Sequence, residues 1–350
     1  MHLHAYKVAD FGVGLGATPA ACSTNDGGKV WYGWDPHAGP LNAHPLGSCA
    51  GTRVPAPSTD EELMRQSLAM LERYNIRAVT SGDAGSLEVV DKWHAASAQR
   101  IIPAIDFLDP AGDPNTGPHF RPLAELRRLV AEHKVSVFAE VAPQYDGMSP
   151  ADPRLDPYFA LAEELDIPVG IHMGEGPPGG PNLDGYAKYR VRMGDPLLLE
   201  DVLVRHPKLR IYVMHFGSPF VDNMIAILFS YPQVYVDVAD NDWGFPRQHF
   251  YSQLRRLMDA GFGKRILFGS DQMIWPHTIE LAIQTIDQAD FLTEEQKRDI
   301  FYNNAAHFLR LKECPFIALP SDSCGQTFSQ SLARRCKDLQ LCIRVERASY

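Results

Sequence analysis

The alternation of apolar and amphipathic segments along this 350-residue sequence predicts an α/β protein with a (β/α)8 TIM barrel. From about residue 61, short apolar runs alternate with segments whose apolar residues recur at helical spacing, which is typical of a parallel sheet covered by helices. Seven such runs, with an eighth strand around His2 and His4, give the number that closes a barrel. An open doubly wound sheet is the alternative, but no GxGxxG motif follows the first strand to support a nucleotide-binding fold.

The predicted elements follow one another in a regular order. Each predicted strand is a nearly continuous apolar run, and these runs lie at 76–82, 101–107, 135–141, 167–174, 209–217, 234–240 and 265–271. Each predicted helix carries an apolar stripe, and these helices lie at 61–74, near 84–98, and at 122–134, 153–165, 196–207, 219–232, 248–262, 278–289 and 293–311. Only Met1 precedes His2, so we expect a short first strand that leaves barrel edges unpaired.

Two segments interrupt this order. Residues 10–60 are rich in Gly, Pro, Ala and His, and a loop of this length after the first strand would leave the carboxyl-terminal face of the barrel, where active sites lie. We expect a lid or pocket wall there, with a mobile surface excursion as the alternative. Residues 312–350 hold four of the six cysteines and match no barrel pattern, so they form a C-terminal tail of unknown role after a barrel at 1–311.

Composition narrows the class of partner. The formal charge of −10 argues against nucleic acid or an anionic membrane surface, and no apolar stretch approaches the ~20 residues of a membrane span. No CxxC pair is present, so neither a zinc knuckle nor a thioredoxin-type motif is expected. No signal peptide is visible, and we expect a cytoplasmic protein with a small-molecule substrate. Because only Met1 precedes the first strand, the loss of a leader peptide is the alternative.

Candidate metal ligands occur at the ends of several predicted strands. His2 and His4 are two residues apart, so on a strand they face the same side. Further ligand types stand near the ends of later strands, and these are Glu140, His172, His215 and Asp271. Each alone has an ordinary explanation, such as a buried core histidine or a helix cap, but together they give a mixed nitrogen and oxygen set that suits Zn²⁺.

Four short motifs now carry a resemblance to a known family. The opening HLH, then GIHMG, VMHFGSP and LFGSDQMIWP, stand in the order seen in the amidohydrolase superfamily. They resemble its amidohydrolase-related branch, which includes aminocarboxymuconate-semialdehyde decarboxylase, and the closing EEQKRDIFYNNAAHFLRL is similar to the end of that branch's barrel. The resemblance covers about residues 1–5 and 76–311.

The resemblance implies roles for individual residues. One divalent metal, expected to be zinc, would be held by His2, His4, His172 and Asp271. His215 would be a further ligand or an acid/base, and Asp271 would also accept a proton from metal-activated water. Glu140 would either bridge two metals, with His172 and His215 as ligands of the second, or be a salt-bridge partner at the strand end. The salt-bridge role is favoured because one metal is usual in the branch.

The substrate and the reaction are less constrained. Arg190 and Arg192 would clamp a substrate carboxylate or else be solvated loop residues, and Glu175 would line the pocket. Aromatic side chains expected to wall the site are Trp34, Tyr145, Trp243 and Trp275. The leading hypothesis is a metal-dependent hydrolase of an ester, lactone or amide. The alternatives are a non-oxidative decarboxylase of an aromatic or unsaturated carboxylic acid, and a non-catalytic barrel that has lost its metal. A homodimer is expected from the branch.

Overall fold

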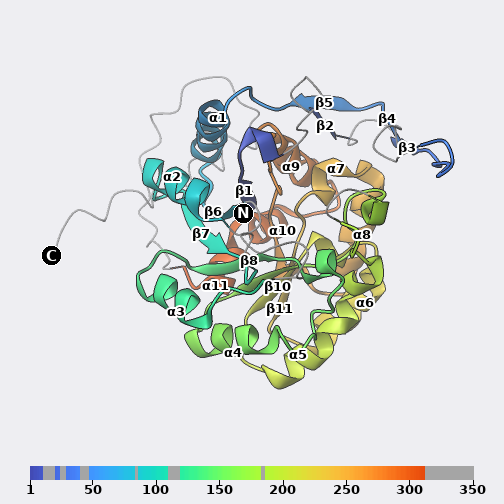
Figure 1. Ribbon diagram of the computed structural model, residues 1–350. Helices are drawn as coiled ribbons and strands as arrows, with labels where there is room; N and C mark the ends of the chain where they lie inside the picture. Colours follow the sequence, from blue (N-terminus) through green and yellow to red (C-terminus); the bar gives the residue numbers. More distant parts are fainter. Residues whose placement is uncertain are drawn as a thin grey trace.

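The computed structural model describes residues 1–10, 20–23, 29–39, 47–82, 86–108, 119–182 and 186–311. In this part of the chain, eight parallel strands form one sheet in the order β1-β6-β7-β8-β9-β10-β11-β12 (Figure 1). Their bounds are His2–Ala5 (β1), Ala78–Gly82 (β6), Ile101–Ile105 (β7), Val137–Val141 (β8), Val169–His172 (β9), Ile211–Met214 (β10), Val234–Asp237 (β11) and Ile266–Leu267 (β12). The predicted (β/α)8 barrel is therefore confirmed.

The short strand β1 is paired on both of its sides. On one side it lies parallel to β6, with His2 opposite Val79. On the other side, the segment after β12 takes over, because His4 N donates to Gln272 O at 2.9 Å and Asp271 N donates to His2 O at 3.1 Å. The expectation that barrel edges beside this strand stay unpaired is therefore wrong. Four residues suffice because the segment 270–272 supplies the hydrogen bonds that the two-residue β12 lacks.

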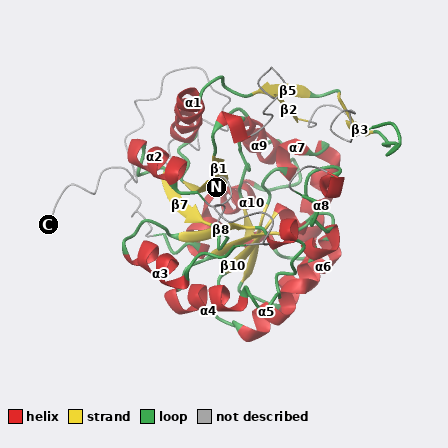
Figure 2. Cartoon of the chain, in the orientation of Figure 1, coloured by secondary structure: helices red, strands yellow, loops and turns green. Residues whose placement is uncertain are grey.

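Helices surround the strands on the outside (Figure 2). Their bounds are Asp60–Arg73 (α1), Glu88–Ala96 (α2), Leu123–Ala131 (α3), Asp156–Leu165 (α4), Glu200–Arg205 (α5), Val221–Ser230 (α6), Asn241–Gly244 (α7), Arg247–Asp259 (α8), Thr278–Asp287 (α9), Glu294–Arg298 (α10) and Asn304–Phe308 (α11). Local sequence sets some of these ends: Thr59 caps α1, and Thr293 with Gln296 forms a capping box at α10.

Strand side chains alternate between the barrel interior and the helices. One cluster of buried residues fills the interior, and it includes Val79, Ile102, Ala104, Val137, Ala139, Tyr212, Met214 and Leu267. Phe308 of α11 joins this cluster, with its ring 5.6 Å from that of Tyr212 and 4.8 Å from that of Tyr235, and so closes the amino-terminal end. The polar side chains that continue these inward rows therefore gather at the opposite, carboxyl-terminal mouth.

The described residues of the predicted 10–60 loop form two small antiparallel sheets. β2 (Ala20–Ser23) pairs with β5 (Thr52–Pro55), and β3 (Lys29–Trp31) pairs with β4 (Gly47–Cys49). A disulfide joins Cys22 to Cys49, and Val54 is fully buried against the main core. The described part of the loop is thus ordered and covalently tied. A disulfide is typical of oxidising compartments, which disfavours the cytoplasmic prediction. Residues 11–19, 24–28, 40–46 and the predicted tail at 312–350 lie outside the described residues.

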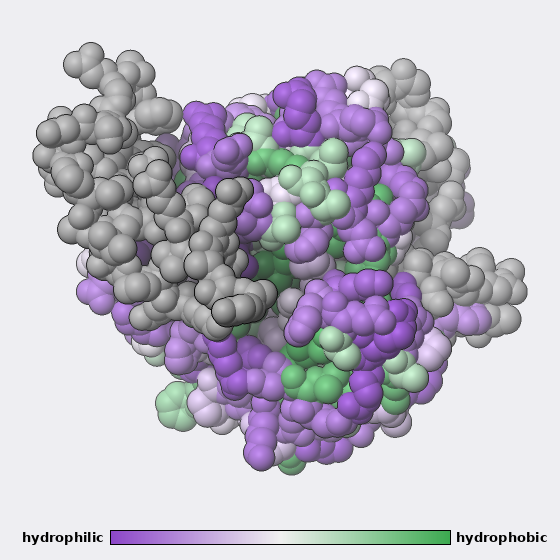
Figure 3. Space-filling view, turned by 90° about the vertical axis from the view of Figure 1, so that its left-hand side faces the viewer, coloured by the Kyte–Doolittle hydropathy of each residue, from purple (hydrophilic) through white to green (hydrophobic). Residues whose placement is uncertain are grey.

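The outer surface is predominantly polar on the face drawn in Figure 3, with apolar residues in small patches. Among the large apolar side chains described, the most exposed are Phe229 on α6, at 84%, and Val204 on α5, at 65%. Within the described ranges, every helix is too short or too polar to cross a lipid bilayer.

Candidate metal centre

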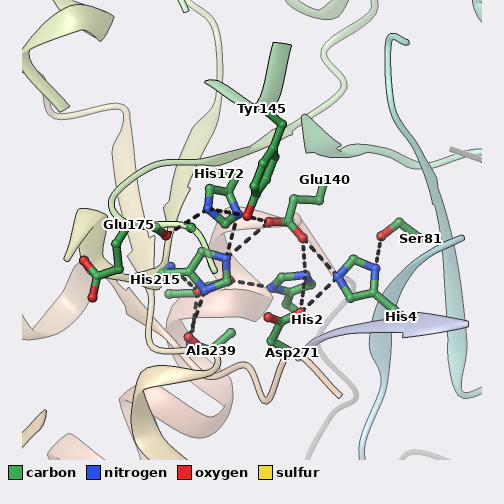
Figure 4. A network of polar contacts seen from close by, with 12 residues as sticks. His2, His4, Ser81, Glu140, Tyr145, His172, Glu175, His215, Ala239 and Asp271 are labelled. Carbon is green, nitrogen blue, oxygen red and sulfur yellow. Dashed lines mark hydrogen bonds and ion pairs between the residues drawn. The ribbon is translucent and has the colours of Figure 1, made fainter. Parts of the chain in front are cut away.

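Six polar side chains converge at the mouth of the barrel from five of its strands or the residues that follow them (Figure 4). β1 supplies His2 and His4, β8 supplies Glu140 and β9 ends in His172. His215 directly follows β10, and Asp271 follows β12. All are at most 7% exposed apart from Glu140, whose side chain is 12% exposed. The structure thus brings together every residue predicted to bind the metal, as well as Glu140.

The first group of potential ligand atoms comes from His2, His4, Glu140 and Asp271. His4 Nε2 lies 2.9 Å from Asp271 Oδ1 and 3.0 Å from Glu140 Oε2. His2 Nε2 lies 3.4 Å from the same Glu140 oxygen and 3.8 Å from Asp271 Oδ1. Two imidazole nitrogens therefore face two carboxylate oxygens across a very small space.

The second group is formed by Glu140, His172 and His215. His215 Nε2 lies 3.2 Å from Glu140 Oε1 and 3.1 Å from His172 Nδ1, and His172 Nδ1 also contacts Glu140 Oε1. The two oxygens of Glu140 are thus turned to different groups. His172, predicted to share an ion with His2 and His4, stands in this second group beside His215.

Each of the four imidazoles is held from outside by its other ring nitrogen. The outer contacts are His2 Nδ1 with Asp237 Oδ2 at 3.2 Å, His4 Nδ1 with Ser81 Oγ at 2.9 Å, His172 Nε2 with Glu175 O at 3.3 Å and His215 Nδ1 with Ala239 O at 3.0 Å. In a neutral ring whose outer nitrogen donates a hydrogen bond to a carboxylate or a carbonyl, the inner nitrogen carries a lone pair. Metal-binding histidines are oriented by outer acceptors of this kind.

The charges of the cluster are strongly coupled. Burial alone would lower the pKa of His2, but the hydrogen bonds to Asp237 and Glu140 outweigh burial and raise that pKa to about 10. Burial likewise works against His215, but Glu140 holds its pKa well above the usual value. The pKa of Glu140 lies well below its ordinary value because the nearby imidazoles outweigh the effect of burial. The carboxylates are therefore stabilised by positive charge, which the imidazoles carry when no cation is bound.

The donor set fits a divalent ion. His2 Nε2 and Asp271 Oδ1 are buried, and the polar atoms that they face belong to this same first group. Ligands of a tetrahedral ion at about 2.0–2.2 Å lie about 3.3–3.6 Å from one another. The four distances within the first group, 2.9 to 3.8 Å, bracket that range. A cation bound by the inner lone pairs of the imidazoles would supply the positive charge that stabilises the carboxylates, so these residues could hold a metal.

The predicted aromatic wall is present in part. Tyr145 packs on the site: its hydroxyl oxygen is 3.4 Å from His172 Nε2, and its ring contacts those of Tyr186 and Tyr189. Trp275 is partly buried between two core clusters, with its ring 6.5 Å from that of Trp243. Trp34 Nε1 donates to Gly39 O within its own loop.

The polar side chains predicted around the substrate lie elsewhere. Arg190 is exposed and donates to the backbone carbonyls of Ala187 and Tyr189, and Arg192 is exposed. The Glu175 side chain turns away from the cluster (Figure 4), and its carboxylate accepts a hydrogen bond from Ser218 Oγ at 3.3 Å. The arginine clamp stays a prediction that these contacts do not favour.

Sequence reasoning missed two residues that hold the cluster. Asp237, only 1% exposed, bonds His2 and accepts from the backbone nitrogens of His215 and Ala239 at 3.0 and 3.1 Å. Ser81 bonds His4. Both stand near the carboxyl ends of predicted strands, the criterion that singled out His172, so the same test applied to every polar residue would have found them.

A TIM barrel whose mouth gathers four imidazoles and two carboxylates has the architecture of metal-dependent barrel enzymes. A sequence profile described as amidohydrolase matches residues 2–311, so the chain belongs to the amidohydrolase family. No curated protein matches the sequence.

Solved structures with TM-scores above 0.5 share this fold, and a further one is similar at a lower score. An uncharacterized TIM-barrel protein from Bordetella bronchiseptica is 18% identical with a TM-score of 0.56, over 73% of this chain and 85% of that chain. A probable 2-pyrone-4,6-dicarboxylic acid hydrolase from Acinetobacter baumannii is 15% identical with a TM-score of 0.52, over 71% and 89%. A 5-carboxyvanillate decarboxylase from Sphingomonas paucimobilis is 16% identical with a TM-score of 0.49, over 70% and 82%. At these identities the likeness concerns the fold alone.

Proposed function

We propose that this chain is a metal-dependent enzyme of the amidohydrolase type that acts on a small organic substrate at the mouth of its barrel. The observation that carries the proposal is the shared arrangement of the four histidines. Each has one ring nitrogen bonded outward and the other turned towards Glu140, Asp271 or both. When bound, a divalent ion, with zinc as the first candidate, would lower the pKa of a water molecule towards about 7 and polarise a substrate carbonyl.

Two residues are assigned to proton transfer. Asp271 is buried, with His4 Nε2 2.9 Å from its Oδ1, and its carboxylate is the group that we assign to accept a proton beside the reacting carbonyl. His215 is held at Nδ1 by Ala239 O, so its Nε2 faces Glu140 Oε1 at 3.2 Å, where it could bind a proton or serve as a further ligand. The surrounding burial keeps bulk water from competing for these protons.

The number of ions depends on Glu140. The single predicted ion would be held by His2, His4, His172 and Asp271, although His172 stands in the second group. If two ions bind, Glu140 would be a ligand of both, and His172 and His215 would hold the second. The opposed orientation of the Glu140 oxygens supports the second arrangement, because each oxygen contacts a different pair of imidazoles.

Hydrolysis of an ester, lactone or amide is the first reaction we assign, since an acceptor carboxylate and an imidazole flank one centre. Non-oxidative decarboxylation of an aromatic or unsaturated carboxylic acid is the second candidate. The cluster of Tyr145 with Tyr186 and Tyr189 beside His172 favours it, because an aromatic wall suits a planar substrate. Both reactions use the same residues.

Elemental analysis of the purified chain tests the metal. Wild type is expected to hold at least one equivalent of divalent ion and His172→Ala less, whereas His37→Ala, which changes an exposed histidine, keeps the wild-type content. Full metal content in His172→Ala would contradict the assignment.

A substrate panel then tests the reaction. The metal-loaded enzyme is assayed for CO₂ release from hydroxybenzoates and unsaturated acids, and for hydrolysis of esters, lactones and amides. Activity confined to one set identifies the reaction. A metal-loaded enzyme inactive on both sets would count against both reactions.

A further inference from the structure

Asp106 is a buried carboxyl at the mouth of the barrel that belongs to neither ligand group. It directly follows β7, whose residues Ile102 and Ala104 point into the barrel interior, while Ile105 faces the helices. Because strand side chains alternate, Asp106 continues the inward row one step above Ala104. The parallel register of β7 with β8, in which Ala104 is opposite Val137, brings this end of β7 towards Glu140.

Only one oxygen of this carboxyl is satisfied. The side chain is 7% exposed and accepts backbone hydrogen bonds from Phe107 and Leu108, which fix its orientation. Its Oδ1 is buried without a hydrogen-bond partner. Burial, with a smaller contribution from Glu140, raises the pKa of Asp106 to about 7. Leaving a buried acceptor unpaired costs about 1–3 kcal/mol, so a ligand that satisfies it gains a strong interaction.

The surroundings indicate which ligand group this oxygen would take. Its charged neighbours include Glu140 and the cation Arg121, and Arg121 is already paired with Glu125 at 3.2 Å. Asp237 and Asp271 add further negative charge to the same mouth. An unpaired acceptor oxygen suits a neutral hydrogen-bond donor and repels a carboxylate placed directly against it.

We propose that Asp106 is a substrate-binding residue that accepts a hydrogen bond from a hydroxyl group of a neutral, hydroxyl-bearing ester or lactone. The inference rests on the proposed function, because it takes the metal centre as the place where the carbonyl of that substrate reacts. It names the substrate class for hydrolysis and assigns recognition to β7 rather than to Arg190 or Arg192.

Two lactams that resist hydrolysis test the assignment. D-glucono-δ-lactam carries hydroxyl groups on its ring, and δ-valerolactam is the same ring without them. Each is titrated calorimetrically into the metal-loaded full-length chain, as wild type, Asp106→Asn, Asp106→Ser and Asp91→Asn. Asp91 is exposed on α2 and provides the matched control. In Asp106→Asn the amide oxygen is expected to keep the backbone hydrogen bonds, and the NH₂ group takes the place of Oδ1 as a donor.

Wild type and Asp91→Asn are expected to bind the hydroxylated lactam at least about 10-fold more tightly than δ-valerolactam. Asp106→Asn and Asp106→Ser are expected to lose about 10- to 100-fold for the hydroxylated lactam alone, which corresponds to one hydrogen bond to a charged group. Metal content stays at the wild-type value in both variants, because Asp106 is in neither ligand group.

The inference is overturned if wild type shows no preference between the lactams, or if the preference survives in folded Asp106→Asn and Asp106→Ser. These results differ from a failure of the proposed function. Wild type that holds no metal contradicts the metal centre in the elemental analysis. Wild type that holds metal and prefers the hydroxylated lactam, but hydrolyses nothing, contradicts only the reaction.

Discussion

The bond between Asp237 and His2 allows a sharp test of the metal centre, through the variant Asp237→Asn. The amide oxygen can still accept from the backbone nitrogens of His215 and Ala239, which lie at 3.0 and 3.1 Å from Oδ1. The amide nitrogen then takes the place of Oδ2, 3.2 Å from His2 Nδ1, so that two donors face each other. His2 relieves this clash by moving its proton to Nε2, and a protonated Nε2 cannot bind an ion.

The expected loss can be estimated in two ways. A hydrogen bond to a charged group is worth about 1.5–3 kcal/mol. Changing the residue that orients a metal-binding histidine typically weakens the metal by about 10- to 100-fold, which is about 1.4–2.7 kcal/mol. The two ranges agree, and since Asp237 is only 1% exposed, solvent screens little of the effect. We therefore expect metal affinity to fall by about 10- to 100-fold.

The assay is competition for zinc against a chromophoric chelator at pH 7.5, with far-ultraviolet circular dichroism as a check on folding. The matched control is Asp242→Asn. Asp242 is a fully buried acidic residue in the segment after β11, the strand that ends in Asp237, and its side chain makes no hydrogen bond to a histidine. The control is expected to bind zinc as wild type does. Folded Asp237→Asn with an affinity within about twofold of wild type would refute the reasoning about the His2 proton.

Three further predictions follow from single features. Glu140→Gln is expected to halve the metal content of a two-ion enzyme, whereas undiminished content in elemental analysis would exclude a bridging role. In metal-free protein, the pKa of Asp106 is higher in the folded than in the unfolded chain, so its protonation stabilises the fold. This contribution to the free energy of unfolding, about 4 kcal/mol, is complete below pH 3.8 and is lost as the pH rises through about 7. Urea unfolding from pH 4 to 8 should therefore show a decline in wild type that Asp106→Asn lacks. Replacing Cys22 and Cys49 by serine opens a 27-residue separation and should lower the free energy of unfolding by about 3.5 kcal/mol, and an unchanged midpoint in denaturant would contradict this.

The fold was predictable because its signal is local and repeated. Each barrel unit is an apolar run followed by an amphipathic helix, and every predicted strand from 76–82 to 265–271 overlaps an observed strand. The prediction failed at the first strand, where the expected unpaired edge is absent. Segment 270–272 pairs with β1, and a contact between two segments so far apart in the sequence leaves no mark in local periodicity.

The sequence by itself determined the inventory of the site. Histidines and an aspartate at strand ends meet because parallel strands present their carboxyl ends at one mouth, so His2, His4, His172, His215 and Asp271 could be grouped before any coordinates. Only the tertiary structure decided how these residues divide between the two ligand groups. Glu140 turns one oxygen to each group, and Glu175 turns its carboxylate away. Side-chain orientation and hydrogen-bond partners depend on packing between distant segments, and sequence spacing does not contain that information.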